Sequence, residues 1–255
     1  MSVWAIADLH LSISTPAKSM EIFSDKWKNY HERIQNNWSS LIKNEDLVLI
    51  PGDISWASTL ADASVDLDWL NKLPGKKLLL KGNHDYWWSS LSKVKAALPK
   101  SISVLQNDIY MFNDIAIGGA RLWDTQEYNF DDYIEFIENP RANDKEENTQ
   151  ADLQEKIFER ELIRLEMSLS KIPKNAKHKI AMTHYPPISA DLKTSKAARI
   201  LEKYGVQTCI FGHLHSIKDN VEMFGKKNNV NYIFAAADYI GFKPLPIIEA
   251  NGDLV

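Results

Sequence analysis

Leu47-Val48-Leu49-Ile50-Pro51-Gly52-Asp53 is the stretch of sequence that decides the fold. Four apolar residues in succession are typical of a strand that is buried on both faces in a parallel sheet. Gly52 allows the chain to turn sharply or to approach another group closely. Asp53 is thereby expected at the carboxyl end of the strand, where open α/β sheets bind their ligands.

Four other stretches share this design, in which an apolar run leads into His, Asp or Asn. They are Val3-Trp4-Ala5-Ile6-Ala7-Asp8-Leu9-His10, Leu78-Leu79-Leu80-Lys81-Gly82-Asn83-His84-Asp85, Ile180-Ala181-Met182-Thr183-His184 and Cys209-Ile210-Phe211-Gly212-His213-Leu214-His215. Because the carboxyl ends of parallel strands meet at one edge of a sheet, five such stretches predict a shared rim of oxygen and imidazole ligands.

Between the strands, apolar residues spaced three or four apart predict amphipathic helices. We expect helices at about 26–43, from Ser58 to about 71, from Ser89 or Ser90 to about 98, at about 150–170 and at about 195–203. Further strands are expected within 102–119, where Asn113-Asp114 forms a hairpin turn, and at 221–224, 230–236 and 245–249.

Composition restricts the possible classes of function. With 255 residues, and with candidate ligands coming from both ends of the chain, we expect a single domain over residues 1–255. A net charge of −4 does not favour nucleic acid as a partner, because a duplex-binding surface is normally basic. The sequence has no signal-peptide pattern and no apolar run long enough to span a membrane, so we expect a cytoplasmic protein. The oligomeric state is left open.

The segment from about 124 to 155 differs from its surroundings. It contains eleven acidic residues against two basic ones, with aromatic residues spaced through its first half. It is longer than an ordinary connection, so we interpret it as an acidic and aromatic insertion. Three interpretations stay open: a solvated excursion, a lid over the site, or a surface that docks a partner.

Seven residues at strand ends are candidate metal ligands: Asp8, His10, Asp53, Asn83, His184, His213 and His215. Carboxylate, imidazole and amide donors without thiolate suit manganese, iron, zinc or cobalt better than calcium. Seven ligands are too many for one small ion, but one bridging carboxylate would divide them into two sites of four. Two ions about 3.5–4 Å apart can clamp both oxygens of an in-line displacement and turn a bridging water into hydroxide.

These residues resemble the five motifs of the calcineurin-like metallophosphoesterases. Asp8-x-His10, Gly52-Asp53, Gly82-Asn83-His84-Asp85, His184 and Gly212-His213-x-His215 match those motifs in order, over residues 8–215. The resemblance implies an α/β fold, a four-layer α/β/β/α sandwich of two mixed sheets flanked by helices. Within the family, the resemblance is to the Asp-x-His branch, because Trp56 stands where purple acid phosphatases have a tyrosine ligand.

The resemblance also implies a role for each ligand. Asp8, His10, Asp53 and His215 would hold one metal ion, and Asp53, Asn83, His184 and His213 the other, with Asp53 as the bridge. Manganese is the first expectation, with iron or zinc as alternatives. His84 would face the substrate, stabilise the transition state and protonate the leaving oxygen.

Three further groups are assigned from the residues themselves. Asp85 follows His84 directly and could orient its ring and keep it cationic. Arg121 is the best candidate for a phosphate contact outside the metal ligands, because its planar fork matches phosphate geometry. Trp56, Trp87, Trp88 and Trp123 lie near these motifs, either as core or as a stacking wall for part of the substrate.

The sequence therefore predicts a dinuclear metal-dependent phosphohydrolase, a phosphatase or phosphodiesterase that uses a metal-bridging hydroxide on a small phosphorylated substrate. One alternative is a pyrophosphatase acting on a nucleotide or lipid-linked diphosphate. Another is a catalytically silent scaffold of the same fold that binds partner proteins. A nuclease of the same fold is disfavoured, because the chain shows no basic groove or added DNA-facing domain.

Overall fold

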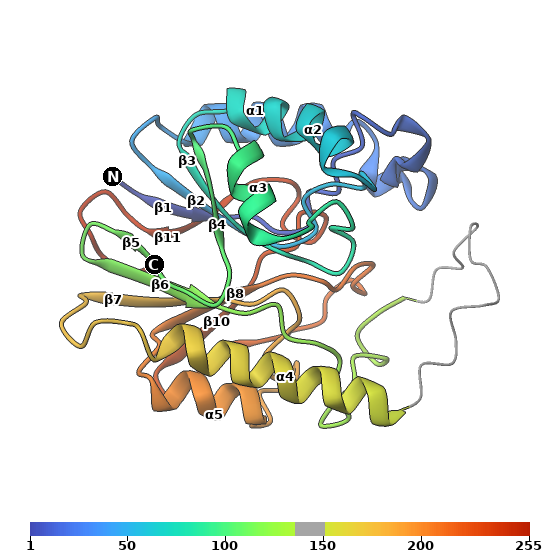
Figure 1. The fold of residues 1–255 in the computed structure, drawn as a ribbon. Coiled ribbons are helices and arrows are strands. Elements are labelled where there is room, and N and C mark those ends of the chain that lie inside the picture. The colour runs from blue at the N-terminus through green and yellow to red at the C-terminus, as the bar shows by residue number, and fades with distance from the viewer. Residues whose placement is uncertain (136–150) are drawn as a thin grey trace. The chain divides into compact units, whose positions relative to one another are not determined.

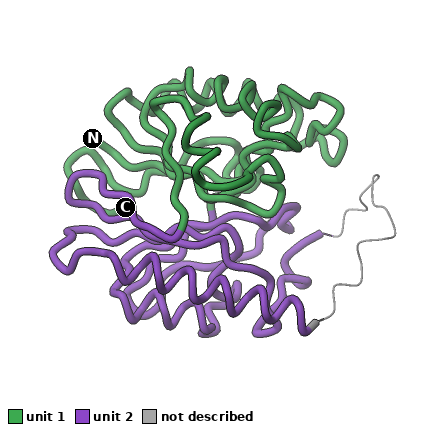
Figure 2. Tube along the Cα trace, viewed as in Figure 1, with its two compact units in different colours: residues 1–106, 235–255 green, residues 107–234 purple. Residues whose placement is uncertain are grey.

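The computed structural model describes residues 1–135 and 151–255. The chain divides into two compact units, coloured separately in Figure 2. Unit 1 comprises residues 1–106 and 235–255, and unit 2 comprises residues 107–234. The expectation of a single domain over residues 1–255 stays a prediction.

Unit 1 is built on a mixed five-stranded sheet in the order β11-β1-β2-β3-β4, in which β1 to β4 are parallel and β11 is antiparallel to β1. Its elements are β1 (Val3–Ala5), the 3₁₀ turns η1 (Pro16–Lys18), η2 (Met20–Ile22) and η3 (Asp25–Trp27), α1 (Tyr30–Leu41), β2 (Leu47–Pro51), α2 (Leu60–Lys72), β3 (Lys76–Leu80), α3 (Leu91–Ala97), β4 (Ile102–Leu105) and β11 (Leu245–Ile248).

The core of unit 1 is formed by residues of this sheet together with residues of α1 and α2 (Figure 1). All five residues of β2 are buried, as the apolar run predicts. Trp38 of α1 and Leu70 of α2 are fully buried in the same cluster as Val48 and Ile50 of β2. Trp87 and Trp88 also belong to this core, so neither is part of an exposed stacking wall.

Unit 2 contains a mixed six-stranded sheet in the order β5-β6-β7-β8-β10-β9, whose four central strands are parallel. Its elements are β5 (Tyr110–Phe112), β6 (Ile115–Gly119), α4 (Ala151–Leu169), β7 (His178–Met182), α5 (Lys196–Lys203), β8 (Thr208–Phe211), β9 (Gly225–Lys227) and β10 (Val230–Phe234). Helices α4 and α5 lie side by side (Figure 1), and α4 packs against β6. The predicted fold class, α/β with two mixed sheets flanked by helices, is confirmed.

Several predicted elements have different bounds in the structure. The first helix begins at Tyr30 rather than near residue 26, because Asn29 has a left-handed φ of 53° that separates α1 from the turn η3. Thr59, not Ser58, caps α2, and its side chain accepts a hydrogen bond from the Asp62 N–H.

The strand predicted at 221–224 is wrong, since β9 covers Gly225–Lys227. Phe224 has a φ of 65°, and its ring packs on Phe211, with ring centroids 4.7 Å apart. A two-residue turn, Asn228-Asn229, joins β9 to β10, and both residues have positive φ as a type I′ turn requires. The predicted hairpin turn at Asn113-Asp114 is confirmed between β5 and β6.

Within residues 1–135 and 151–255, no helix combines the length and the apolar character that a membrane span needs.

We expect Gly119→Ala to lower the stability of the protein. A Cβ at Gly119 would lie 2.0 Å from the Met182 carbonyl oxygen on the neighbouring strand β7, and backbone cannot move aside cheaply. We expect a loss of about 2 kcal/mol or more in the free energy of unfolding, measured by urea denaturation. Gly225→Ala is the control, because nothing lies within 4 Å of its added Cβ. Equal losses in the two variants would contradict the packing argument.

Candidate metal centre

The candidate ligands of unit 1 follow three adjacent parallel strands. Asp8 and His10 come after β1, Asp53 comes after β2, and Asn83 comes after β3. Parallel pairing places the carboxyl ends of the three strands at one edge of the sheet. The sequence prediction that these four side chains share one rim is consistent with this topology.

The acidic and imidazole side chains at this edge lie close together. Asp8, His10 and Asp53 are 0%, 1% and 2% exposed. His10 Nε2 lies 3.7 Å from Asp53 Oδ2. Ligand atoms of Asp8 lie within 4.8 Å of one on His10 and of one on Asp53. Asp8 is therefore close enough to share a metal ion with His10 and, separately, with Asp53.

Three of these candidate ligands have a backbone conformation that residues other than glycine rarely adopt. The φ angles of Asp8, His10 and Asp53 are 57°, 45° and 52°. Left-handed backbone in residues other than glycine costs on the order of 1 kcal/mol each and is concentrated at functional sites. The surrounding contacts must therefore stabilise these conformations.

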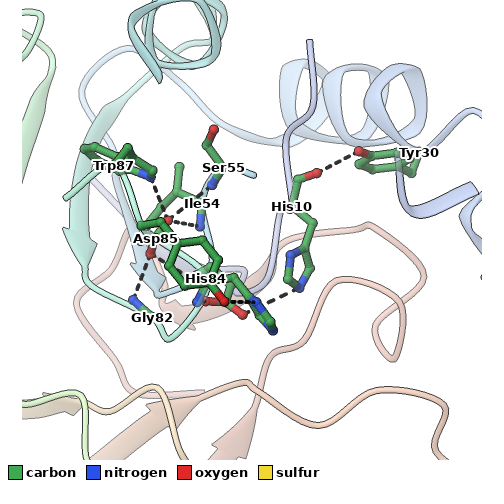
Figure 3. A network of polar contacts seen from close by, with 10 residues as sticks. His10, Tyr30, Ile54, Ser55, Gly82, His84, Asp85 and Trp87 are labelled. Carbon is green, nitrogen blue, oxygen red and sulfur yellow. Dashed lines mark hydrogen bonds and ion pairs between the residues drawn. The ribbon is translucent and has the colours of Figure 1, made fainter. Parts of the chain in front are cut away.

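Hydrogen bonds along the rim hold the strained backbone in place. The Asp8 N–H donates to the Gly52 carbonyl at 3.1 Å, and the His10 N–H donates to the Asp53 carbonyl at 2.9 Å. The Tyr30 hydroxyl donates to the His10 carbonyl at 2.7 Å (Figure 3). Burial raises the pKa of Tyr30 to about 12, so this hydroxyl stays protonated and remains a donor.

The Asp85 carboxylate connects the loops that follow β2 and β3. It is fully buried and accepts five hydrogen bonds. Figure 3 shows it among donors from both loops. The donors are the N–H groups of Asp53 (3.0 Å), Ile54 (2.9 Å), Ser55 (3.2 Å) and Gly82 (2.8 Å) and the Trp87 indole (2.9 Å).

Two opposing influences act on the Asp85 carboxyl group. Desolvation, and then the nearby charge of Asp53, raise its pKa to about 7, whereas the hydrogen bonds from Gly82, Ser55 and Trp87 lower it. The five donors all stabilise the ionised form, and both carboxylate oxygens receive them. Asp85 therefore positions the Asp53 loop, which replaces the sequence-based interpretation that it orients the His84 ring.

His84 is held beside Asp53 by its own backbone. The His84 N–H donates to Asp53 Oδ1 at 2.9 Å. Gly82 makes this approach possible, because a Cβ at Gly82 would lie 2.0 Å from the same Asp53 oxygen. The half-buried His84 ring packs on Trp56, with ring centroids 4.4 Å apart, and its Nδ1 lies 3.5 Å from the Tyr86 hydroxyl.

Trp56 is a contribution that the sequence analysis did not assign. The Trp56 ring stacks on the His10 ring, with centroids 5.0 Å apart and an interplanar angle of 23°. It also contacts the His84 ring. The only indication in the sequence was its position three residues after Asp53. Trp56 therefore belongs neither to the core alone nor to a free stacking wall, but fixes two histidine rings.

In unit 2, the candidate ligands follow β7 and β8. His184 is fully buried, and its N–H donates to the Arg121 carbonyl at 3.0 Å. His213 is half-buried and has a φ of 77°. The rings of His184 and His213 lie with centroids 5.1 Å apart at an angle of 72°. His215, also half-buried, follows two residues after His213.

Arg121 has structural partners in unit 2. Its guanidinium lies 4.4 Å from the centroid of the Trp123 ring and 3.9 Å from the buried Glu161 carboxylate of α4. Arg160 and Arg164 also face Glu161, so this carboxylate is shared among three cations. Burial lowers the pKa of Arg121, and the nearby Glu161 opposes that shift. These contacts hold Arg121 against Trp123, and its phosphate contact stays a prediction.

The first part of the acidic and aromatic insertion lines a pocket in unit 2. Residues 136–150 of the insertion lie outside the described residues. The pocket has a volume of about 310 Å³. Its lining consists of Trp123, Asp124, Thr125, Tyr128, Asn129, Phe130, Asp131, Ile134, Tyr185, Pro186, His213 and Leu214. The described part of the insertion therefore forms part of a pocket wall beside a candidate ligand.

The residues present fit a divalent transition metal. Asp8 and Asp53 are buried carboxylates close to one another, an arrangement that is costly unless a cation or a proton compensates it. Oxygen and imidazole donors are the ligands that manganese, iron and zinc accept. Each unit thus carries a set of side chains suited to such ions.

Comparison with known proteins agrees with these features. The model of the calcineurin-like phosphoesterase family matches residues 1–217, and the chain belongs to that family. The match contains every candidate ligand, together with His84 and Asp85.

Individual relatives are more distant. The chain is 34% identical over 86 residues to the gene 66 protein of Mycobacterium phage L5, a match that covers 33% of this chain and 40% of the phage protein. The phosphopantetheinyl hydrolase PptH from Mycobacterium tuberculosis has a similar structure, with a TM-score of 0.55, 12% identity and coverage of 100% of this chain and 98% of that one. A protein of unknown function, AQ665 from Aquifex aeolicus, gives a TM-score of 0.50 at 16% identity and covers 96% of this chain and 95% of its own. At these identities the two structures support the fold alone.

We expect Asp85→Asn to destabilise the protein and to weaken metal binding. The amide group would turn one acceptor into a donor facing backbone N–H groups, which leaves buried donors unsatisfied at a cost of about 3 kcal/mol. The free energy of unfolding and the affinity for Mn²⁺ are to be measured. Asp68→Asn, an exposed position on α2, is the matched control. An Asp85→Asn protein with the stability and Mn²⁺ affinity of the control would exclude the positioning role.

Proposed function

We propose that this chain is a dinuclear metal-dependent phosphohydrolase that cleaves a small phosphomonoester or phosphodiester. The family membership, the oxygen and imidazole donors of unit 1 and the imidazole donors of unit 2 support this proposal. Manganese is the first choice of metal, because carboxylate, amide and imidazole ligands all suit it. A cytoplasmic location stays a prediction.

The ligand assignment follows the family motifs residue by residue. Asp8, His10, Asp53 and His215 are proposed for one ion, and Asp53, Asn83, His184 and His213 for the other. The observation that carries the proposal is the environment of Asp53. Its carboxylate is buried, lies 3.7 Å from His10 and comes within 4.8 Å of Asp8, and it follows the central strand of the three that supply ligands in unit 1. A carboxylate in that central position is suited to serve two ions.

The chain's own residues prepare the reaction in three ways. When bound, two divalent ions supply Lewis-acid stabilisation of the phosphoryl oxygens and lower the pKa of water. Asp85 and Gly82 fix the Asp53 loop, and Trp56 limits the motion of the His84 ring. His84, half-buried beside Asp53, is placed to hold a proton for the leaving oxygen and to stabilise charge that develops there.

We expect removal of metal to abolish hydrolysis, and Asp53→Asn to remove both ions. Chelator-stripped protein should regain hydrolysis of p-nitrophenyl phosphate or bis-p-nitrophenyl phosphate when Mn²⁺ is added. Asp53→Asn should bind less than one Mn²⁺ per chain by elemental analysis, because one carboxylate serves both ions. Asp68→Asn should bind as much as the unmodified protein. Full metal content in Asp53→Asn would refute the bridging role, and bound metal without hydrolysis of either ester would favour a scaffold or a selective pyrophosphatase.

We expect His84→Ala to keep its metal ions and to lose turnover. The loss in kcat should be about 100-fold or more, as is typical for a general acid. It should be smaller for p-nitrophenyl phosphate than for phenyl phosphate, because p-nitrophenolate leaves without protonation. Tyr86→Phe, which removes the hydroxyl 3.5 Å from His84 Nδ1, is the control and should change kcat little. The same loss on both esters would indicate charge stabilisation without proton transfer.

A further inference from the structure

We propose that the pocket of unit 2 binds the organic part of the substrate and selects a flat heteroaromatic ring that carries an amino group, such as a nucleobase. This inference rests on the proposed function and adds a substrate class to it. The proposed metal ligands account for the phosphate and do not explain the aromatic and acidic pocket beside His213.

Two aromatic rings form the wall of the pocket nearest to the candidate ligand. Trp123 and Tyr185 lie with ring centroids 5.1 Å apart, and the Tyr185 ring lies 3.9 Å from that of His213. Tyr185 is buried, whereas Trp123 is half-buried and lines the hollow. An aromatic face of this kind stacks on flat rings, a contact worth about 1–3 kcal/mol for a base.

Two contacts with residues that do not line the pocket keep Trp123 in place before any ligand binds. The Arg121 guanidinium stacks on the indole at 4.4 Å, and the indole N–H donates to the Gln154 side chain in α4. Because Arg121 is itself paired with the buried Glu161, the Trp123 ring is fixed between the pocket and α4. A fixed wall loses little conformational freedom when a ring stacks on it.

Another part of the pocket lining is also ordered by hydrogen bonding. The Tyr128 hydroxyl donates to the Pro186 carbonyl at 2.8 Å, and the rings of Tyr128 and Phe130 lie edge to face with centroids 5.5 Å apart. Burial raises the pKa of Tyr128, so the hydroxyl remains a donor. This hydrogen bond holds the segment that contains Tyr128 and Phe130 against Pro186, which follows His184 in the chain.

The polar groups of the pocket indicate what kind of ring it accepts. Asp124, Asn129 and Asp131 line it and are exposed, and no Lys or Arg is found among the described lining residues. Carboxylates accept hydrogen bonds from amino and ring N–H groups and repel a phosphate. The phosphate of a substrate is therefore excluded from the pocket itself, while an amino-bearing ring is favoured.

The position and size of the pocket fit a leaving group. His213 is one of its lining residues, and Asp124 Oδ1 lies 3.9 Å from His213 Nε2. A phosphoryl group bound at a metal ion on His213 would have its ester substituent next to the pocket. A volume of about 310 Å³ lies at the small end of the range for ligand sites. It suits one ring system rather than a lipid chain, which disfavours the lipid-linked diphosphate considered above.

The first test measures binding without hydrolysis. Adenosine and ribose are titrated into the full-length protein, and binding is followed by ligand-observed NMR. We expect adenosine to bind and ribose not to bind, and Trp123→Leu to weaken adenosine binding by about tenfold or more, as expected for the loss of one stacking contact. Equal binding of adenosine by the two proteins, or none by the unmodified protein, would overturn the proposal.

A second pair of variants tests the exposed carboxylates of the pocket, Asp124 and Asp131, which form its acidic rim. Because these side chains are exposed, the substitutions do not put folding at risk. Asp124→Asn/Asp131→Asn changes two exposed side chains, and Asp132→Asn is the matched control, since Asp132 is exposed and does not line the pocket. The unmodified protein should hydrolyse AMP with a higher kcat/KM than purine riboside 5′-phosphate, which lacks the amino group. The double variant should lose this difference in kcat/KM, and the control should keep it. An unchanged preference in the double variant would exclude the acidic rim as the selective element.

The two levels of proposal are separable in these experiments. Adenosine binding that depends on Trp123, in a protein with no metal-dependent hydrolysis, would support the pocket and refute the phosphohydrolase. Metal-dependent hydrolysis with no adenosine binding would support the phosphohydrolase and refute the pocket.

Discussion

One buried carboxylate, that of Asp85, constrains the edge of the unit 1 sheet that carries the candidate ligands, which we call the ligand edge. Asp85 accepts hydrogen bonds from the loops after β2 and β3, and therefore determines where Asp53 can lie relative to Gly82 and His84. The loop after β2 has little regular structure of its own, and Asp53 adopts a left-handed φ of 52°. A side chain with two acceptor oxygens satisfies several N–H groups at once, which no amide or hydroxyl can do in the same volume. The geometry of the proposed bridging ligand thus depends on a residue that is assigned to no metal ion.

The strands could be predicted from the sequence because their information is local. The runs that form β2, β3, β7 and β8 are apolar and are followed by Gly, Asp, Asn or His. Both the strand and the candidate ligands at its carboxyl end can therefore be recognised in the sequence. The segment 11–29 was harder, because three short 3₁₀ turns have no periodicity to detect. The strand β9 was misplaced by a few residues for a related reason. Its hairpin turn depends on positive φ at Asn228 and Asn229, whereas the apolar residues that suggested a strand at 221–224 pack their side chains from irregular backbone.

Some residues of the candidate site could be predicted from their spacing in the sequence, whereas others could be recognised only from their contacts in the structure. Asp8, His10, Asp53 and Asn83 could be selected because each follows an apolar run, and three of them are brought close together in unit 1. The roles of Asp85 and Arg121 could not be obtained so, because adjacency in sequence does not determine which way a side chain points. Asp85 faces backbone N–H groups rather than the ring of its neighbour, and Arg121 faces Trp123 and Glu161 of a helix about 40 residues away in the chain. Trp56 and the pocket of unit 2 likewise arise from contacts between residues that no sequence period relates.

The electrostatic cost of the ligand edge explains why so many neutral groups surround it. Asp8, Asp53 and Asp85 are all buried within unit 1, and burial of three carboxylates opposes folding unless hydrogen bonds or cations compensate it. Asp85 is compensated by five donors supplied by the protein itself. Asp53 Oδ1 accepts the His84 N–H, and Asp8 and Asp53 lie near one another and near His10, an arrangement that a bound cation would stabilise further. The same burial that makes the edge costly therefore makes it selective for a multivalent cation, because a bound ion that stabilises only the folded chain adds its binding free energy to folding.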